Sequence, residues 1–364
     1  MNVLLIQAQI VHYRIPVFNA LGRLPGVNLT VVHSGAPIGG AANSFREERV
    51  PVRKCGRFAL QTGLRSHVAA NDVVIGMLDP QWLSVIGLAI QSEPRSKLLL
   101  WGHGLGKRSV GQWLRKWLCR RAAGVILYGD DACGQLLKAG VPPSRVFVAP
   151  NTLEVANHGR NQAAKRTLFL YVGSLHVRKG VHQLITAFAA AKPSLPPETR
   201  LLIIGSGPEE ARLRRLTESL VVQGEVQFRS AVHDEETLRN EFDKALAYVS
   251  PGHVGLGVLH SFAYGVGVVT RRGAAHAPEF ANIADGITGM LFNEEPNELA
   301  EILVQLARSR VLADRLGQAA YEHFVEHRQV CHMTAGFKHA IAMVAALGAA
   351  SRSGPSQSSV IYAS

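Results

Sequence analysis

Residues 250–269 read SPGHVGLGVLHSFAYGVGVV, and this stretch combines the loop, helix and strand of a parallel α/β unit. A loop with Gly252, Gly255 and Gly257 leads into an apolar helical segment, and a β-branched run ends the stretch. A loop without side chains leaves main-chain N–H groups uncovered where a helix begins, and such a place favours anions. His260 lies one turn into the helix, so we expect its imidazole to hydrogen-bond a ligand hydroxyl. The alternative is a satisfied histidine in a helix that only packs on its sheet.

Strand and helix patterns alternate through the second half of the chain around this stretch. The strand patterns are continuous apolar runs, which are typical of strands buried on both faces of a parallel sheet. We predict such strands at 167–173, 200–205, 225–230, 246–251 and 266–270. We predict helices that begin at Val181, Glu209 and Glu235, and further helices at 296–308, 311–324 and 329–348.

The first half repeats this alternation. Apolar runs predict strands at 2–7, 27–33, 72–77, 97–102, 124–129 and 145–150. The Gly-rich and then basic stretch 35–58 breaks the rhythm, and we interpret it as a mobile loop or a short insertion. The whole pattern predicts an α/β protein with two Rossmann-like, doubly wound parallel-sheet domains and a ligand cleft between them.

The polar segment 151–166 lacks periodicity and predicts the linker between the two domains. We therefore place an N-terminal domain at 1–160 and a C-terminal domain at 161–328. A helix at 329–350 is expected to cross back to the N-terminal domain, and the polar tail 351–364 is expected to be disordered.

Positive charge is concentrated in the first half of the chain. Residues 1–165 contain 20 Lys and Arg against 8 Asp and Glu, so the whole net charge of +12 lies there. This asymmetry indicates an anionic partner, which can be a lipid surface, a phosphorylated substrate or a nucleic acid. No recognised nucleic-acid-binding motif accompanies the basic residues, so we expect no nucleic acid.

Cysteine usage and hydropathy favour a cytoplasmic protein. The four cysteines show neither a CxxC pair nor the spacing of metal ligands, so we expect reduced thiols and no metal site. No secretory signal is visible, and no apolar run reaches the roughly 18 to 20 residues that span a bilayer. We expect a cytoplasmic protein, soluble or peripheral on the inner face of the cell membrane.

Two further loops follow predicted strands and carry candidate ligand-binding residues. In GSLHVRKG (173–180), Arg178 and Lys179 stand where a helix begins, which suits a phosphate or diphosphate; the alternative is a solvated basic pair. In WGHG (101–104), His103 lies between glycines, where it can bind a sugar hydroxyl or merely form a turn. The GSGP at 205–208 is not the dinucleotide fingerprint, which disfavours a dehydrogenase.

An amphipathic helix is predicted within residues 107–124. Trp113 and Trp117 share one face of this helix. Basic residues surround them, and we predict that these face the membrane: Arg115, Lys116, Arg120 and Arg121. Tryptophans beside basic residues fit an interfacial helix on anionic lipid. The alternative is a helix that covers the sheet with its tryptophans in the core.

The order of these motifs resembles glycosyltransferase family 4, which comprises retaining, nucleotide-sugar-dependent enzymes of the GT-B fold. The second half follows the family's order with YVGSLHVRKGVHQLITAF, LLIIGSGPEEARL, VSPGHVGLGVLHSFAYGVGVV and PEFANIADGITGMLF. The first half resembles members with HYRIPVF near the start, WGHG in the middle and VFVAPNTLE before the linker. The resemblance covers nearly the whole chain.

The resemblance implies site residues in both domains. The C-terminal domain would bind the donor. The catalytic residues would be Lys179 on the donor diphosphate, His103 beside the transferred sugar, and His260. The resemblance also implies further donor-binding residues, namely Arg178, Gly205, Gly255, Leu256, Gly257, Ser261 and Glu279. His12 and Arg14 would lie on the acceptor side.

The chain departs from the family at three positions. The paired glutamates E-x7-E fall on Gly252 and His260, although the pair His260–Ser261 looks like a variant within the family. The family's phosphate-binding arginine falls on Ser174, and Arg178 stands four residues further on. The resemblance implies no cofactor and no metal, because basic residues stabilise the departing nucleoside diphosphate.

We therefore expect a hexosyltransferase-type glycosyltransferase that moves a sugar from a nucleotide-sugar donor to a glycan or lipid-linked acceptor, with retention, in cell-surface polysaccharide biosynthesis. A catalytically degenerate protein that binds nucleotide sugar without turnover is one alternative. A nucleotide-sugar epimerase of the same fold is another.

Overall fold

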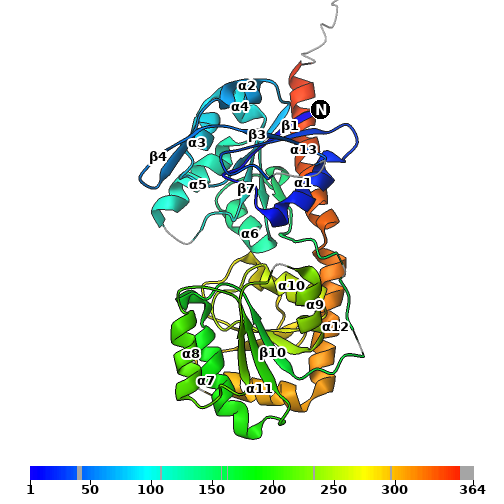
Figure 1. Cartoon of the computed structure of the whole chain (residues 1–364). Coiled ribbons are helices and arrows are strands. Elements are labelled where there is room, and N and C mark those ends of the chain that lie inside the picture. The colour runs from blue at the N-terminus through cyan, green and yellow to red at the C-terminus, as the bar shows by residue number, and fades with distance from the viewer. Residues whose placement is uncertain are drawn as a thin grey trace, which may run out of the picture. The chain divides into compact units, whose positions relative to one another are not determined.

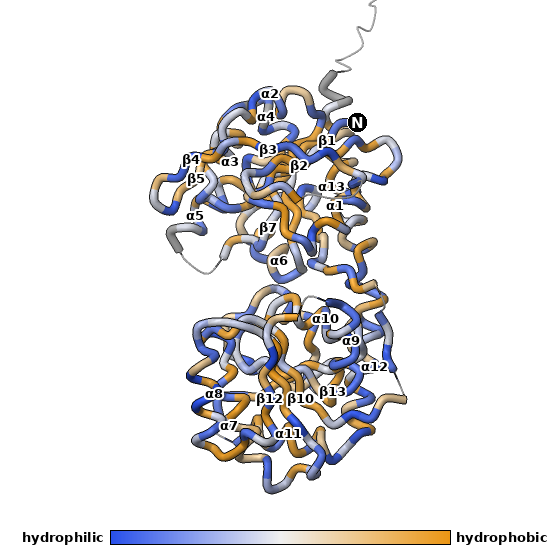
Figure 2. Tube along the Cα trace, in the orientation of Figure 1, coloured by the Kyte–Doolittle hydropathy of each residue, from blue (hydrophilic) through white to orange (hydrophobic). Residues whose placement is uncertain are grey.

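A computed structural model describes the chain except residues 39–42, 107–108, 157, 162, 233, 296 and 353–364. The chain forms two compact units, each a parallel sheet covered by helices (Figure 1). The N-terminal unit comprises Met1–Asn151 and Val330–Ser364, and the C-terminal unit comprises Thr152–Gln329. Apolar residues are concentrated on the strands inside each unit (Figure 2).

The N-terminal unit contains a seven-stranded parallel sheet in the order β3-β2-β1-β6-β7-β8-β9. Its strands are β1 (Asn2–Ile6), β2 (Asn28–His33), β3 (Arg46–Arg49), β6 (Val73–Met77), β7 (Leu98–Gly102), β8 (Gly124–Leu127) and β9 (Val146–Val148). Side chains of the central strands are buried on both faces, as their continuous apolar sequences predict.

Helices cover both faces of this sheet. They are α1 (Ile15–Gly22), α2 (Leu64–Ala69), α3 (Leu83–Ile90), α4 (Ser92–Ser96), α5 (Ser109–Arg121), α6 (Asp130–Lys138) and α13 (Val330–Arg352), with a 3-10 turn η1 (His12–Arg14) before α1. One core contains Leu88 of α3 and Leu118 of α5, and the other contains Phe18 of α1 and Phe337 of α13. The sheet therefore lies between two apolar layers.

Helix α13 belongs to the N-terminal unit although it ends the chain. Met333, Phe337 and Ile341 are buried in the core beside α1, so the helix returns to the unit in which the chain began. By length and composition alone, the helical stretch Arg310–Gly348 in the described part of the chain is able to cross a membrane. The buried side chains of α13 are those of a core helix.

The stretch 35–58, predicted as a loop or insertion, contains regular strands. β3 pairs in parallel with β2 at the edge of the sheet, and β4 (Val52–Cys55) pairs antiparallel with β5 (Phe58–Gln61). The sequence of β3 is REER, which has no apolar run because charged residues are common on exposed edge strands. Because the residues of β3 are charged, an apolar pattern could not predict this strand.

The C-terminal unit contains a six-stranded parallel sheet in the order β12-β11-β10-β13-β14-β15. Its strands are β10 (Leu168–Val172), β11 (Arg200–Ile204), β12 (Val226–Arg229), β13 (Ala245–Val249), β14 (Val268–Arg271) and β15 (Gly289–Phe292). Its helices are α7 (Val181–Ala191), α8 (Glu210–Ser219), α9 (Glu235–Asp243), α10 (Gly257–Ala263), α11 (Glu298–Arg308) and α12 (Arg310–His327).

The C-terminal unit begins nine residues earlier than predicted, because the segment before residue 160 packs on it. The Gly159 amide donates to the carbonyl of Ala263 at 2.9 Å, and Arg160 bonds the Asp314 carboxylate. Asp314 also lies 3.6 Å from Nε of the buried Arg166. Arg310 pairs with the same carboxylate at 3.4 Å, so this acid compensates three arginines, and the predicted division after residue 160 lies inside the unit.

Candidate functional site

In the C-terminal unit, the two loops that the sequence singled out bind each other. One follows β10 and leads into α7, and the other follows β13 and leads into α10. The amides of Gly252 and His253 donate to the carbonyls of Lys179 and Arg178, each at 2.9 Å. The Lys179 ammonium donates to the carbonyl of His253 at 2.8 Å. Three hydrogen bonds therefore hold the basic pair against the Gly-rich loop.

Close backbone packing explains the glycine at position 252. A Cβ on Gly252 would lie 2.6 Å from the carbonyl carbon of Lys179 and still closer to the carbonyl oxygen of Arg178. At Gly205, φ is +154° and a Cβ would overlap the carbonyl of Gly173. The glycine that replaces the family's first glutamate is thus required by this loop pairing.

Lys179 is a half-buried cation close to a buried acid. Burial and, to a smaller extent, the neighbouring Arg178 lower the pKa of its ammonium, Glu279 opposes both, and the resulting pKa is about 8. Glu279 is only 3% exposed, whereas Arg178 is exposed to solvent. A cation whose charge is disfavoured by desolvation gains from a bound anion, so this place suits a diphosphate.

His260 and Ser261 are engaged within the C-terminal unit. Nε2 of His260 lies 3.3 Å from the carboxylate of Glu235, and Tyr264 donates to the same carboxylate at 2.6 Å. The His260 ring centroid lies 5.6 Å from that of Phe242. The Ser261 hydroxyl is fully buried and donates to the carbonyl of Val266 at 2.7 Å, so the predicted donor contact by this side chain is wrong.

The glycines at the start of α10 differ in their surroundings. A Cβ on Gly255 would meet nothing within 4 Å, so this position is open. A Cβ on Gly257 would lie 2.5 Å from the hydroxyl of Tyr248, so this glycine serves packing against the sheet. Leu256, between them, caps the helix. Their predicted contacts with the donor stay predictions.

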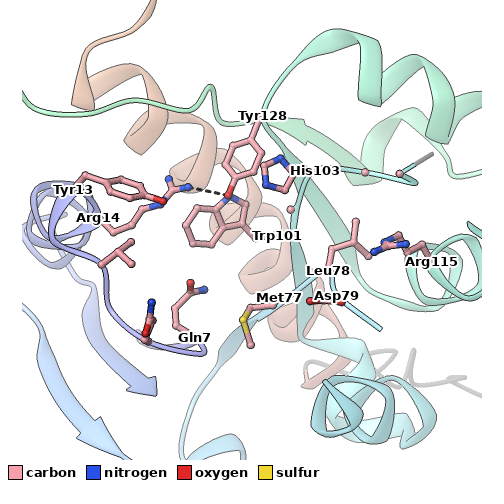
Figure 3. Close-up of a pocket in the computed structure, with 15 residues that line it drawn as sticks. Gln7, Tyr13, Arg14, Met77, Leu78, Asp79, Trp101, His103, Arg115 and Tyr128 are labelled. Atoms are coloured by element: carbon pink, nitrogen blue, oxygen red, sulfur yellow. Dashed lines mark hydrogen bonds between the residues drawn. The ribbon is translucent and has the colours of Figure 1, made fainter. Parts of the chain in front are cut away.

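The N-terminal unit has a cavity of about 370 Å³ at the carboxyl ends of its strands (Figure 3). Gln7 follows β1, Asp79 follows β6, and Trp101 and His103 come from β7 and the loop after it. Ligands bind at this end of the strands in doubly wound sheets. The cavity is therefore a candidate binding site inside the unit.

Arg14 is buried in the wall of this cavity among aromatic rings. Its guanidinium carbon lies 4.7 Å from the ring centroid of Trp101, 5.1 Å from that of Tyr13 and 5.4 Å from that of Tyr128. It donates to the Tyr128 hydroxyl at 3.0 Å and contacts the sulfur of Met333. The rings stabilise the charge by cation–π attraction.

His103 and Arg14, predicted in different roles, line the same cavity, whereas His12 does not belong to its lining. The His103 ring lies 4.7 Å from that of Tyr128, and the exposed His12 packs edge-on against Tyr13. The sequence analysis missed Asp79, Trp101 and Tyr128. Asp79 directly follows a predicted strand, and that position was the signal available for finding it.

Three of the four basic residues of α5 that were predicted to face a membrane have a place within the unit, and their contact with a membrane stays a prediction. Arg115 lines the cavity. Arg120 donates to the carbonyl of Ala139 at 2.8 Å, and Arg121 donates to that of Ala89 at 2.9 Å. These carbonyls lie at helix ends, which lack partners within their own helices.

Trp117 packs against the core while Trp113 stays 69% exposed. Lys116 lies one helical turn from Trp113 and, like Arg115, forms no hydrogen bond with the described side chains. The described residues contain no group of three or more His, Cys, Asp or Glu side chains arranged to hold a metal ion.

The family model described as Glycosyl transferases group 1 matches residues 156–323. The match lies within the C-terminal unit and covers less than half of the chain. Lipopolysaccharide glucosyltransferase WaaG of Escherichia coli (strain K12) is 30% identical over 169 residues, which are 45% of this chain and 45% of that protein. Lipopolysaccharide core biosynthesis glycosyltransferase LpsE of Rhizobium meliloti (strain 1021) is 28% identical over 163 residues, 44% of this chain and 46% of that protein. Both matches span less than half of the relative's length.

Solved structures of low sequence identity align with 94% of the chain and show its fold. The structure of Anabaena Alr3699/HepE in complex with UDP and glucose aligns with a TM-score of 0.67 at 15% identity, over 94% of this chain and 99% of that chain. A crystal structure of WaaG aligns with a TM-score of 0.64 at 17% identity, over 94% of this chain and 99% of that chain. The chain therefore has the two-domain α/β architecture of the GT-B fold.

Proposed function

We propose that this chain is a glycosyltransferase that moves a hexose from a nucleotide-sugar donor to a glycan or a lipid-linked acceptor, in the biosynthesis of a cell-surface polysaccharide. The observation that carries the proposal is the half-buried Lys179, held by the loop of Gly252 in a unit that the group 1 family model matches. The UDP and UDP-glucose bound by HepE support a donor of this class.

The chemistry of Lys179 fits the departure of a nucleoside diphosphate. Negative charge grows on the bridging phosphate oxygen as the bond to the sugar breaks, and a preplaced cation lowers the energy of that state. Arg178, exposed beside it, adds a second positive charge. We propose that these side chains take the part of a divalent cation, so that the reaction needs no cofactor.

We further propose that the anomeric configuration is retained. The departing phosphate then accepts the proton of the incoming hydroxyl, so no protein carboxylate has to act as nucleophile. This agrees with Gly252 and His260 at the positions of the family's glutamates. NMR of the product's anomeric proton tests retention directly, and an inverted product would exclude it.

Donor hydrolysis and transfer assays test the activity. We expect Lys179→Ala to lower turnover about a hundredfold or more, the usual effect of removing one preorganised charge-stabilising donor. Lys165→Ala is the matched control, because the Lys165 side chain is 78% exposed and its ion pair with Glu198 is long, at 3.9 Å. Full activity in EDTA is expected, and loss of activity restored by a divalent cation would contradict the cofactor-free proposal.

A catalytically degenerate donor-binding protein is the second candidate. His260 is engaged by Glu235 and aromatic rings, so the residue at the place of the family's second glutamate is occupied inside the unit. Such a protein would bind a nucleotide sugar in calorimetry and release no product. A nucleotide-sugar epimerase, in contrast, would convert the donor when no acceptor is present.

We also propose a peripheral position on the cytoplasmic face of the cell membrane. The support is the positive charge of residues 1–165 and the exposed Trp113 beside Lys116 on α5. Flotation with anionic and with neutral liposomes tests this. We expect the protein to float with anionic liposomes and Trp113→Ala to weaken the association, whereas equal recovery with both lipids would end the proposal.

A further inference from the structure

Two arginine side chains reach the cavity of the N-terminal unit from elements far apart in the sequence. Arg14 comes from η1 and Arg115 from α5, and they stand on different sides of the cavity (Figure 3). The acid in the lining is Asp79, whose carboxylate accepts from the amide of Gln81 at 3.1 Å. The charged lining thus carries an excess of positive charge.

Arg14 keeps hydrogen-bonding capacity for a ligand. A guanidinium has five N–H donors, and the structure gives Arg14 a bond to Tyr128 and a contact with sulfur. The side chain is 7% exposed, yet it forms no ion pair with a carboxylate in the part of the chain that the structure describes. Burying a cation without a counter-ion costs free energy unless a bound partner compensates its charge.

Two glycines make room for the Arg115 side chain, which has no counter-ion among the described side chains. Its Nη1 lies 2.7 Å from the point that a Cβ on Gly111 would occupy, and 3.5 Å from the same point on Gly106. The absence of side chains there makes room for the guanidinium beside the cavity. Outside residues 107–110, whose side chains are not described, Arg115 has neither a hydrogen bond nor an ion pair.

The remaining walls suit a sugar. Asp79, Gln7 and Gln9 offer acceptors and donors for hydroxyl groups, and Trp101 and Tyr13 offer aromatic surface. A neutral sugar uses those groups but leaves two guanidiniums uncompensated. A phosphate or carboxylate on the sugar matches the planar fork of an arginine with two parallel hydrogen bonds.

We propose that this cavity binds a saccharide acceptor through an anionic substituent, with Arg14 and Arg115 as its two anchors. The inference rests on the proposed glycosyltransferase function and adds the chemical class of the acceptor. Phosphate and carboxylate share the required chemistry, and the experiment below separates them.

Calorimetric titration of the full chain with mannose 6-phosphate, glucuronic acid and methyl α-mannoside tests the proposal. We expect at least one acidic sugar to bind about tenfold or more tightly than the neutral one, as charge-assisted hydrogen bonds predict. Tighter binding of mannose 6-phosphate identifies a phosphate, and tighter binding of glucuronic acid identifies a carboxylate. Equal or absent binding of all three overturns the proposal.

Variants locate the binding. Arg115→Gln is expected to weaken the acidic sugar about tenfold to a hundredfold and to leave the neutral sugar unchanged. Arg65→Gln, on exposed α2 of the same unit, is the matched control and should bind like the wild type. Arg14→Lys keeps the positive charge but loses the planar guanidinium that forms two parallel hydrogen bonds. The thermal midpoint of this variant shows whether it is folded. An unaltered affinity in Arg115→Gln overturns the assignment whatever Arg14→Lys does.

Donor hydrolysis, measured without any acceptor, separates this inference from the proposed function. Hydrolysis that persists while acidic sugars fail to bind refutes only the anionic acceptor. Acidic sugars that bind while no nucleotide sugar is bound or hydrolysed refute the glycosyltransferase function and, with it, the role of the bound sugar as acceptor. Displacement of mannose 6-phosphate by UDP alone would assign the arginines to the donor and overturn the inference.

Discussion

Replacing Gly252 by alanine tests whether the pairing of the two loops positions Lys179. The added Cβ would lie 2.6 Å from the carbonyl carbon of Lys179, a distance at which the backbone has to move. That movement breaks the bonds from the Gly252 and His253 amides to the opposite loop. Gly255→Ala is the matched control in the same loop, because its Cβ would meet nothing within 4 Å.

The two substitutions should change the free energy of unfolding in opposite directions. Overpacking against a fixed neighbour costs about 1–3 kcal/mol, and each hydrogen bond lost adds about 1 kcal/mol. At an open position with ordinary φ, glycine to alanine stabilises by about 0.4–1 kcal/mol, because the unfolded chain loses freedom. We therefore expect Gly252→Ala to lower the unfolding free energy of the C-terminal unit by about 3–6 kcal/mol relative to Gly255→Ala.

Hydrogen exchange of peptides from the C-terminal unit, followed through urea denaturation, measures this difference. Tryptophan fluorescence supplies an internal control, because all four tryptophans belong to the N-terminal unit. The urea midpoint of the fluorescence transition should be the same in both variants as in the wild type. Equal stability of the C-terminal unit in the two variants would refute the steric argument for Gly252.

Three further outcomes follow from charged groups in the C-terminal unit. Asp314→Asn leaves three arginines without their shared acid and should cost about 3 kcal/mol or more in urea denaturation, whereas Glu294→Gln, whose side chain is 83% exposed, should cost less than about 1 kcal/mol. Folding lowers the pKa of Lys179 from 10.5 to about 8, so between these pH values the unfolded chain binds one proton more than the folded chain. The free energy of unfolding should therefore rise from pH 8 to 10.5, and it should rise more in the wild type than in Lys179→Met. His260→Glu puts a second carboxylate beside Glu235, which lies 3.3 Å from the imidazole, so thermal stability at neutral pH should fall and the added change Glu235→Gln should restore it.

The layered fold was predictable because each buried strand is marked by residues that are adjacent in the sequence. Buried parallel strands such as β1, β7 and β11 are continuous apolar runs, and the structure places each within about two residues of its predicted range. β3 escaped because its residues are charged and its strand character comes from pairing with β2. An edge strand of this kind has no pattern of its own.

Candidate site residues were predictable only where they stand beside glycines at strand ends. His103, Arg178 and Lys179 were found in this way. The enclosure of Arg14 by Trp101 and Tyr128 joins residues 87 and 114 positions apart, and no local pattern indicates it.

Arg115 shows the same limit in a helix. Its position on an amphipathic surface suggested a membrane, whereas the packing of α5 against the loop of Gly106 turns it to the cavity. Which neighbour a helix face meets is decided by tertiary structure. The sequence therefore predicted the elements of the site better than the partners of its side chains.

Calorimetric titration of UDP, GDP and ADP into the wild type, Lys179→Ala and Lys165→Ala tests most directly that the C-terminal unit binds a nucleoside diphosphate through Lys179. We predict that at least one of the three binds the wild type and Lys165→Ala equally, and binds Lys179→Ala about tenfold or more weakly. Binding that is unchanged in Lys179→Ala, or absent from the wild type with all three nucleotides, would contradict the account.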